Sequence, residues 1–192
     1  MIGRGFRVRF KAAMVAGLFV VGCHVVPPLP RLGQVPDFSL IDHEGHPIRR
    51  ADLSGSVWIA DFIFTRCAGQ CPLMSAEMAQ FHHALREPRL VSFSVDPSYD
   101  TPPVLAQYAA HYGAHAPHWR FVTGSADAIT SLAQQGFHLG IGVDGTAEEP
   151  ITHSVRFVLV DQQGWIRGTY EATDARAMQQ LQSDARRLAA EE

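Results

Sequence analysis

Two cysteines separated by three residues, Cys67 and Cys71, are the side chains of this sequence best suited to chemistry. They follow a nearly all-apolar segment, Val57 to Phe64, which is typical of a strand buried on both faces. Pro72 suits the first position of a helix, where its missing N–H group is not needed. We therefore expect both thiols at the carboxyl end of a central strand, beside a helix N-terminus, where α/β sheets bind ligands.

The Cys-x3-Cys spacing allows three kinds of chemistry. Residues four apart on a helix have Cα atoms about 6 Å apart, which suits a structural disulfide, a pair of metal ligands or a redox-active dithiol. A structural disulfide that closes so short a loop would gain little entropy. The helix N-terminus and Arg66 are expected to lower the pKa of both thiols, which favours the thiolates that bind metals and attack disulfides.

His153 is the candidate third metal ligand, because it lies near the start of a predicted strand, Ile151 to Val160. In the fold expected below, the beginning of that strand approaches the cysteine loop. Two thiolates and one imidazole form a soft three-coordinate site that suits Cu(I), whereas zinc prefers a fourth ligand. The alternative is a histidine at a strand end that serves only local hydrogen bonds.

The order of the expected elements predicts an α/β fold. The sequence pattern gives a hairpin over 38–49, the central strand and its helix (71–86), a strand (89–95), a helix (101–112), a strand (119–122), a helix (125–135), two paired strands (151–160 and 165–170) and a helix from 174. This order favours a central mixed sheet with helices on both faces and an N-terminal hairpin. A cysteine pair at a strand–helix junction in such an order points to a thioredoxin-like fold, formed as one domain by residues 37–192.

The N-terminal segment is expected to be a targeting signal. Residues 1–11 are basic and residues 12–22 are apolar, which fits a lipoprotein-type signal peptide over 1–22; a bilayer span needs about 20 apolar residues. The segment that ends at Cys23 resembles the lipobox of bacterial lipoproteins, which predicts lipidation of Cys23. An uncleaved N-terminal anchor is the alternative. Residues 23–36 then form the lipidated cysteine and a proline-rich linker.

The charge of the chain argues against a nucleic-acid partner. Without residues 1–22, 12 basic and 19 acidic residues remain, for a net charge of −7. Lys11 is the only lysine of the chain, which excludes a Schiff-base or phosphate-loop lysine from the body of the protein.

Three motifs resemble those of the Sco/SenC family, copper-binding thioredoxin-like proteins of cytochrome c oxidase assembly. They are Thr65-Arg-Cys-Ala-Gly-Gln-Cys-Pro72, Val95-Asp-Pro-Ser-Tyr-Asp-Thr101 and Thr152-His153, in the family's order and with compatible spacing. One departure is Ala68, where the family commonly has proline.

This resemblance implies a copper site and a cellular role. It implies that copper is bound by Cys67, Cys71 and His153, in a domain held at the periplasmic face of the bacterial inner membrane. The implied partner is the copper-bearing subunit of cytochrome c oxidase, or another copper carrier, whose binuclear copper centre the protein helps to mature. Asp96 and Asp100 match paired aspartates of the family and are expected to support the site or a surface for a basic partner. Local hydrogen bonding and helix capping are an equally good interpretation of both.

Other readings stay open. A thiol–disulfide reductase would use Cys67, the more exposed thiol, for attack and Cys71 for resolution. A peroxidase of the peroxiredoxin type is disfavoured because Thr65 lies two, not three, residues before Cys67. A redox or copper sensor would have the same sequence features as a copper chaperone. The remaining histidines are expected to be exposed: 82 and 83 on the cysteine helix, and 111, 115 and 118 in a solvated loop.

Overall fold

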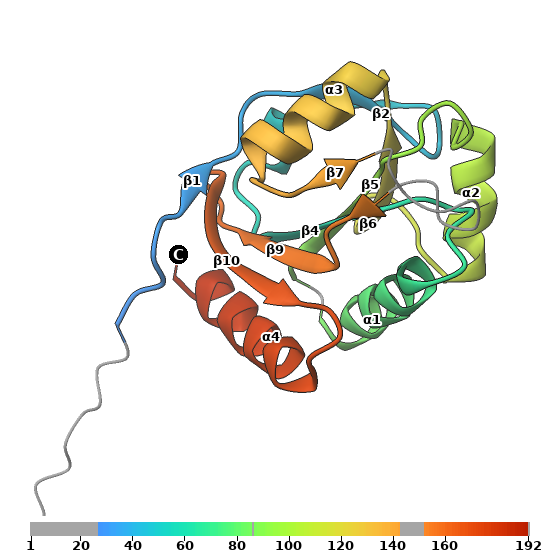
Figure 1. Cartoon of the computed structure of the whole chain (residues 1–192). Helices are drawn as coiled ribbons and strands as arrows, with labels where there is room; N and C mark the ends of the chain where they lie inside the picture. The colour runs from blue at the N-terminus through green and yellow to red at the C-terminus, as the bar shows by residue number, and fades with distance from the viewer. Residues whose placement is uncertain (1–26, 86, 143–151, 192) are drawn as a thin grey trace, which may run out of the picture.

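The computed structural model of the chain describes residues 27–85, 87–142 and 152–191. Its strands are β1 (Gly33–Gln34), β2 (Ser39–Asp42), β3 (Pro47–Arg49), β4 (Trp58–Ile63), β5 (Arg89–Ser94), β6 (Trp119–Thr123), β7 (Ile141–Gly142), β8 (Thr152–His153), β9 (Arg156–Val160) and β10 (Trp165–Glu171). Its helices are η1 (Arg50–Leu53), α1 (Gln70–Ala84), α2 (Pro102–His111), α3 (Ala126–Ser131), which runs on into the wider turn η2 (Leu132–Gly136), and α4 (Ala175–Ala189). Figure 1 shows their arrangement.

Eight strands form one mixed sheet in the order β1-β10-β9-β4-β5-β6-β2-β3. The central strands β4, β5 and β6 run parallel, and β9 runs antiparallel to β4. β2 and β3 form an antiparallel hairpin at one edge, and β1 pairs with β10 at the other. The strands β7 and β8 form a separate two-stranded ribbon.

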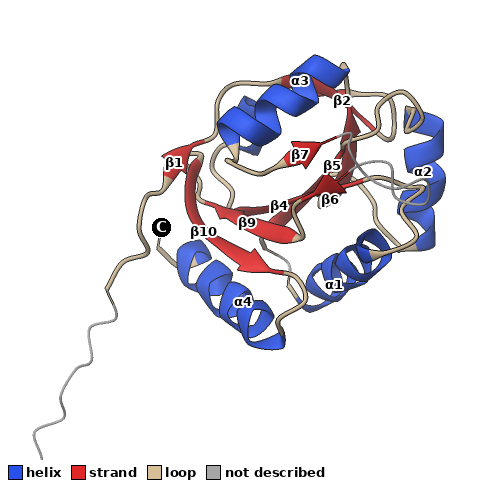
Figure 2. Ribbon diagram, viewed as in Figure 1, coloured by secondary structure: helices blue, strands red, loops and turns tan. Residues whose placement is uncertain are grey.

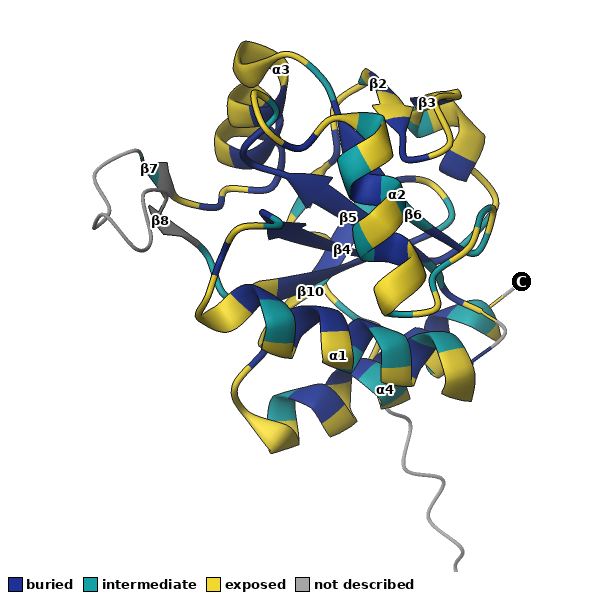
Figure 3. Cartoon of the chain, turned by 90° about the vertical axis from the view of Figure 1, so that its right-hand side faces the viewer, coloured by how far each residue is buried: buried dark blue, intermediate teal, exposed yellow. Residues whose placement is uncertain are grey.

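Helices lie on both faces of the sheet: α1 and α4 on one, α3 on the other (Figure 2). On the α3 face the rings of Phe62 and Phe93 stack at 5.1 Å, and Phe137 packs edge-on against Phe62 at 5.3 Å. On the opposite face Phe81 of α1 contacts Phe157 of β9. Figure 3 shows the sheet as the buried centre of the molecule. Burial of these aromatic side chains supplies much of the apolar stabilisation.

The α/β architecture expected from the sequence is therefore confirmed, including the mixed sheet, the helices on both faces and the N-terminal hairpin. Two segments differ from expectation. The strand expected over 151–160 is interrupted at Ser154 and Val155, so that β8 pairs with β7 and only β9 joins the main sheet. Part of the expected linker, residues 33–34, adds strand β1 to the sheet edge.

The described chain offers no helix that is long and apolar enough to span a bilayer. The predicted signal peptide (1–22) and the lipidation site Cys23 lie outside the described residues.

Candidate functional site

The strand β4 ends at the loop that carries the cysteines. Every residue of this strand is buried, as its apolar sequence predicts, and its last residue, Ile63, is followed by a short loop before α1 begins at Gln70. Cys67 lies in the loop and Cys71 in the first turn of the helix. Pro72 is the third helical residue rather than the first, a position at which its missing N–H group is still not needed by the helix.

The two thiols are close together, reduced and buried. The backbone N–H of Cys71 donates to the sulfur of Cys67 over 3.5 Å, and the N–H of Phe64 donates to the sulfur of Cys71 over 3.4 Å. Neither cysteine forms a disulfide. Cys67 retains 7% of its surface and Cys71 none, so Cys67 is the more exposed thiol, as expected.

The expected lowering of both thiol pKa values is wrong for Cys71. Burial raises the pKa of Cys71 well above its ordinary value; the N–H of Phe64 lowers it by a smaller amount than burial raises it, and the neighbouring Cys67 and Asp61 also raise it. Arg66 does not offset this, because its guanidinium pairs with the carboxylate of Asp96 instead of a thiol. Desolvation of the buried sulfur outweighs the helix N-terminus.

Asp61 is a buried acid near the cysteines that sequence reasoning missed. It has no exposed surface, and neither carboxylate oxygen accepts a hydrogen bond from the described residues. Its neighbour across the strand pair, Ser92, lowers the pKa of Asp61, and the Ser92 hydroxyl oxygen also accepts a hydrogen bond from the indole N–H of Trp119. Burial is the larger effect and raises the pKa of Asp61 to about 7. An acid within an otherwise apolar strand was the signal that could have revealed it.

Asp100 links the cysteine loop to the loop that follows β5. It is fully buried and accepts hydrogen bonds from the backbone N–H of Thr65 (3.1 Å) and from the hydroxyl of Ser94 (2.6 Å). The hydroxyl of Thr65 also donates to it. Asp100 does not cap α2, because its oxygens are used by the cysteine loop and β5; the N-cap of that helix is Thr101.

Asp96 makes the second connection between the same two loops. Its carboxylate accepts hydrogen bonds from Arg66 and from the hydroxyl of Ser98. The guanidinium of Arg66 also stacks over the ring of Tyr99, 4.3 Å from its centre. Both aspartates thus hold the loop that precedes Cys67.

The backbone of His153 belongs to β8, three residues before β9 begins at Arg156. Because β9 runs antiparallel to β4, with Ala60 opposite Val158, β9 begins at the same end of the central strands at which β4 finishes. The cysteine loop lies at this end. The structure describes the backbone of His153 but not its side chain.

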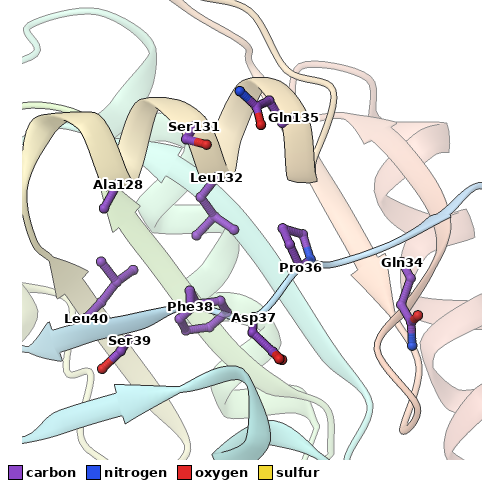
Figure 4. Close-up of a pocket in the computed structure, with 10 residues that line it drawn as sticks. All are labelled: Gln34, Pro36, Asp37, Phe38, Ser39, Leu40, Ala128, Ser131, Leu132 and Gln135. Atoms are coloured by element: carbon purple, nitrogen blue, oxygen red, sulfur yellow. The ribbon is translucent and has the colours of Figure 1, made fainter.

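A groove elsewhere on the molecule has a different character. It has a volume of about 530 Å³ and lies between β2 and α3 (Figure 4). Apolar and neutral polar side chains line it, and Asp37 is the only charged residue among them. The groove offers neither a thiol nor an imidazole.

Known proteins are similar to this chain in sequence and in fold. The SCO1/SenC family model matches residues 30–189. The "SCO1 protein homolog" of Bacillus subtilis is 32% identical over 158 residues, covering 80% of this chain and 81% of that protein. A "SCO1/SenC family lipoprotein" from Bacillus anthracis is 30% identical with a TM-score of 0.76, covering 82% of this chain and 95% of that structure.

Two further solved structures bear on function. One, described as identifying "a disulfide switch in BsSco, a member of the Sco family of cytochrome c oxidase assembly proteins", is 28% identical with a TM-score of 0.74, covering 86% of this chain and all of that structure. ScoI of Bradyrhizobium japonicum, solved "with copper bound", is 20% identical with a TM-score of 0.69, covering 81% of this chain and 99% of that structure, a likeness of fold. These similarities confirm the expected thioredoxin-like fold of Sco proteins, and the chain belongs to the SCO1/SenC family.

Proposed function

We propose that this protein carries copper through Cys67, Cys71 and His153 and helps to mature the binuclear copper centre of cytochrome c oxidase. The observation that carries the proposal is the pair of adjacent reduced thiols at the sheet edge of an SCO1/SenC chain. The cytochrome c oxidase assembly role named for the related BsSco and the copper bound to the Bradyrhizobium protein support it.

The donor set matches the chemistry of copper. Thiolate and imidazole ligands suit Cu(I), and three such ligands leave no fourth protein donor of the kind that a structural zinc site uses. Copper is cargo in this scheme, bound and then passed on. The raised pKa of Cys71 means that the ion must displace a tightly held proton, so copper affinity should rise with pH.

The placement of the ligands is consistent with one site. Both cysteines lie where β4 ends, and the antiparallel β9 brings the segment of His153 to the same edge of the sheet. The hydrogen bonds of Asp96 and Asp100 fix the loop before Cys67, which supports a positioning role for both.

The proposed location rests on the N-terminal sequence. A lipid on Cys23, or an uncleaved anchor, would hold the domain at the periplasmic face of the inner membrane, where the copper-bearing subunit of the oxidase is reached. The related Bacillus anthracis protein is described as a lipoprotein. Labelling of cells with a palmitate analogue should mark the wild-type protein and leave a Cys23→Ala variant unmarked; equal labelling of both would contradict lipidation there.

The direct test of the copper site is titration of the reduced full chain with Cu(I), with X-ray absorption on the loaded protein. We expect one copper ion with two sulfur ligands and one nitrogen ligand. Single variants Cys67→Ser, Cys71→Ser and His153→Ala should each lower affinity, by at least about tenfold. His46→Ala, which removes an exposed imidazole in the β2–β3 turn, is the matched control and should bind normally. Copper without cysteine sulfur would refute the proposal.

A thiol–disulfide reductase is the second candidate function, favoured by the short contact between the Cys71 N–H and the Cys67 sulfur. The Cys67 thiolate would attack a disulfide of the acceptor and form a mixed disulfide, releasing one acceptor thiolate. Cys71 would then lose its proton and attack Cys67, which releases the second acceptor thiol and leaves a Cys67–Cys71 disulfide.

The two functions separate in a His153→Ala strain. Exchange of thiols and disulfides needs no imidazole ligand, whereas copper transfer does. Normal maturation of the oxidase in this strain, together with lost maturation in Cys67→Ser and Cys71→Ser strains, would favour the reductase. Loss of maturation in all three would favour the copper carrier.

A further inference from the structure

Four histidines from two distant parts of the sequence meet at the end of the molecule opposite the cysteine loop. His82 and His83 lie in the last turn of α1, and His115 and His118 lie in the loop between α2 and β6. Together with Ala84 and Leu85 they line a surface hollow of about 570 Å³. Of the histidines expected to be exposed, His83, His111 and His115 are exposed, whereas His82 and His118 are half-buried because the fold packs their two segments together.

His82 is at the centre of this histidine cluster. Its Nδ1 atom is 2.7 Å from the Nδ1 atom of His118, a hydrogen-bond distance. Its ring centre is 4.7 Å from that of His118 and 4.6 Å from that of His115. The buried ring of Trp119 lies against it, with centres 5.8 Å apart.

The pair of Nδ1 atoms has nearly the spacing of two ligands of one metal ion. Bonds of about 2.0–2.1 Å from a first-row ion to two imidazole nitrogens put those nitrogens roughly 2.9 Å apart at a right angle. The observed 2.7 Å is close to that separation. A metal ion that replaces the proton shared by the two rings needs a slightly wider separation of the two Nδ1 atoms and a rotation of both rings, so that their lone pairs converge on the ion.

The backbone around the cluster is held by hydrogen bonds to the sheet. The carbonyl of His118 accepts from the N–H of Leu90 over 2.7 Å, and the carbonyl of His115 accepts from the N–H of Trp119 over 3.0 Å. Because both loop histidines are anchored at the backbone, the pair of rings is preorganised instead of being assembled from a free loop.

His115 is the better third ligand. In the described part of the chain, the group of three side chains whose ligand atoms already lie within 4.8 Å of one another is Asp42, Glu44 and His46, so a third imidazole must turn to join His82 and His118. His115 is exposed and its ring already packs against His82. The ring centre of His83 is farther from that of His82, at 5.5 Å, than the ring centre of His115 is.

We propose that His82, His118 and His115 form a second metal site, for a divalent first-row transition ion, with Cu(II) bound most tightly. Imidazole nitrogens suit copper, nickel and zinc, and the order of affinities for such ligands peaks at Cu(II). The site is distinct from the cysteines: His82 is eleven residues beyond Cys71 on α1, about 17 Å along the helix. The inference therefore stands independently of the proposed carrier function.

The test is a Cu(II) titration of the untagged full chain with all three cysteines replaced by serine, which removes every thiol. We expect one tightly bound ion whose electron paramagnetic resonance spectrum shows equatorial nitrogen ligands. Tryptophan fluorescence should be quenched, because Trp119 contacts His82. In this background His82→Ala and His118→Ala should each lower the Cu(II) affinity by at least about tenfold, and Trp119→Phe should reduce the quenching.

His46→Ala is the matched control, because His46 belongs to the acidic group in the β2–β3 turn, where Asp42 already accepts hydrogen bonds from the N–H groups of Glu44 and His46. It should bind Cu(II) as the parent does. The variants His82→Gln and His118→Gln keep the size and polarity of the side chains, and thermal melts verify that all variants fold. Unchanged Cu(II) affinity in folded His82 and His118 variants, or its loss in His46→Ala, would overturn the proposal.

Discussion

Cys67 and Cys71 are neighbours in space but differ in chemistry. Cys71 is fully buried and its thiol pKa is raised by that burial, whereas Cys67 keeps a small exposed surface in the loop before the helix. An entering partner, whether a metal ion or a disulfide, therefore meets Cys67 first. Cys71 is the inner thiol, which reacts only after its proton has been transferred to an acceptor.

This asymmetry predicts the order of alkylation. With iodoacetamide at pH 8, Cys67 should be modified at least about ten times faster than Cys71, because only a small fraction of the Cys71 thiol is ionised. Mass spectrometry of peptides after a time course, in the Cys67→Ser and Cys71→Ser variants and the wild type, measures both rates. Equal rates in the two single variants would contradict the assigned roles.

Asp61 predicts a dependence of stability on pH. Its pKa is about 7 in the folded protein and 3.8 in the reference state, so the unfolded chain releases the proton first as pH rises. Below pH 3.8 the residue contributes no difference; between that value and about 7 it lowers the free energy of unfolding progressively. The full loss is on the order of 4 kcal/mol above pH 7.

The variant Asp61→Asn removes this titration and is expected to flatten the stability profile. Urea unfolding at pH 4, 6 and 8 should show that the variant gains stability relative to the wild type as pH rises. Comparing the two profiles cancels the contribution of all other titrating groups. Parallel profiles would mean that Asp61 keeps its proton throughout or has a nearly ordinary pKa.

At the scale of elements, the cysteine loop depends on its attachment to the loop after β5. Asp100→Ala leaves the N–H and the hydroxyl of Thr65 without their buried acceptor, which should cost about 2–4 kcal/mol of unfolding free energy. Hydrogen exchange of the amides from 64 to 69 should accelerate. Asp96→Ala is the comparison, with a smaller expected loss because its partner Arg66 is half-exposed. Equal losses in the two variants would contradict this hierarchy.

The elements that the sequence predicts well are those with strong local patterns. β4 is an unbroken apolar run, and Ser125 and Asp174 begin helices as N-caps that accept backbone hydrogen bonds. The two-residue strands β1, β7 and β8 have no such pattern, since each forms only because a partner distant in sequence is present. For the same reason, the sequence does not predict the break at Ser154 between β8 and β9.

The candidate site shows the same limit. The cysteines were predictable from their spacing beside a strand–helix junction, and both lie there. The raised pKa of Cys71 was not, because it depends on how deeply the first turn of α1 is buried by the rest of the fold. The contact between His82 and His118 joins residues 36 positions apart and needs the packing of α1 against the loop before β6.

For the molecule as a whole, the segment before β2 is an integral part of the fold. Val35 is buried, and the guanidinium of Arg167 donates to the carbonyls of Leu29 and Pro30. A chain that begins at Asp37 should therefore be less stable than one that begins at Pro27, by at least about 2 kcal/mol from the lost burial of Val35 alone. Chemical denaturation of the two chains measures the difference; equal stability would show that β1 is dispensable.

The attachment of β1 also sets the orientation of the protein on whatever holds its N-terminus. β1 pairs with β10 at Ile166, Ile166 pairs with Val160 of β9, and Val160 pairs with Trp58 at the start of β4. The segment before β1 therefore lies level with the start of β4, whereas the thiols follow its end. Six residues of strand separate these levels, about 20 Å. If the chain is tethered through the segment before β1, the histidine cluster faces the anchoring surface and the cysteine loop lies farther from that surface. A recipient held on the same surface would then have to present its site at that height.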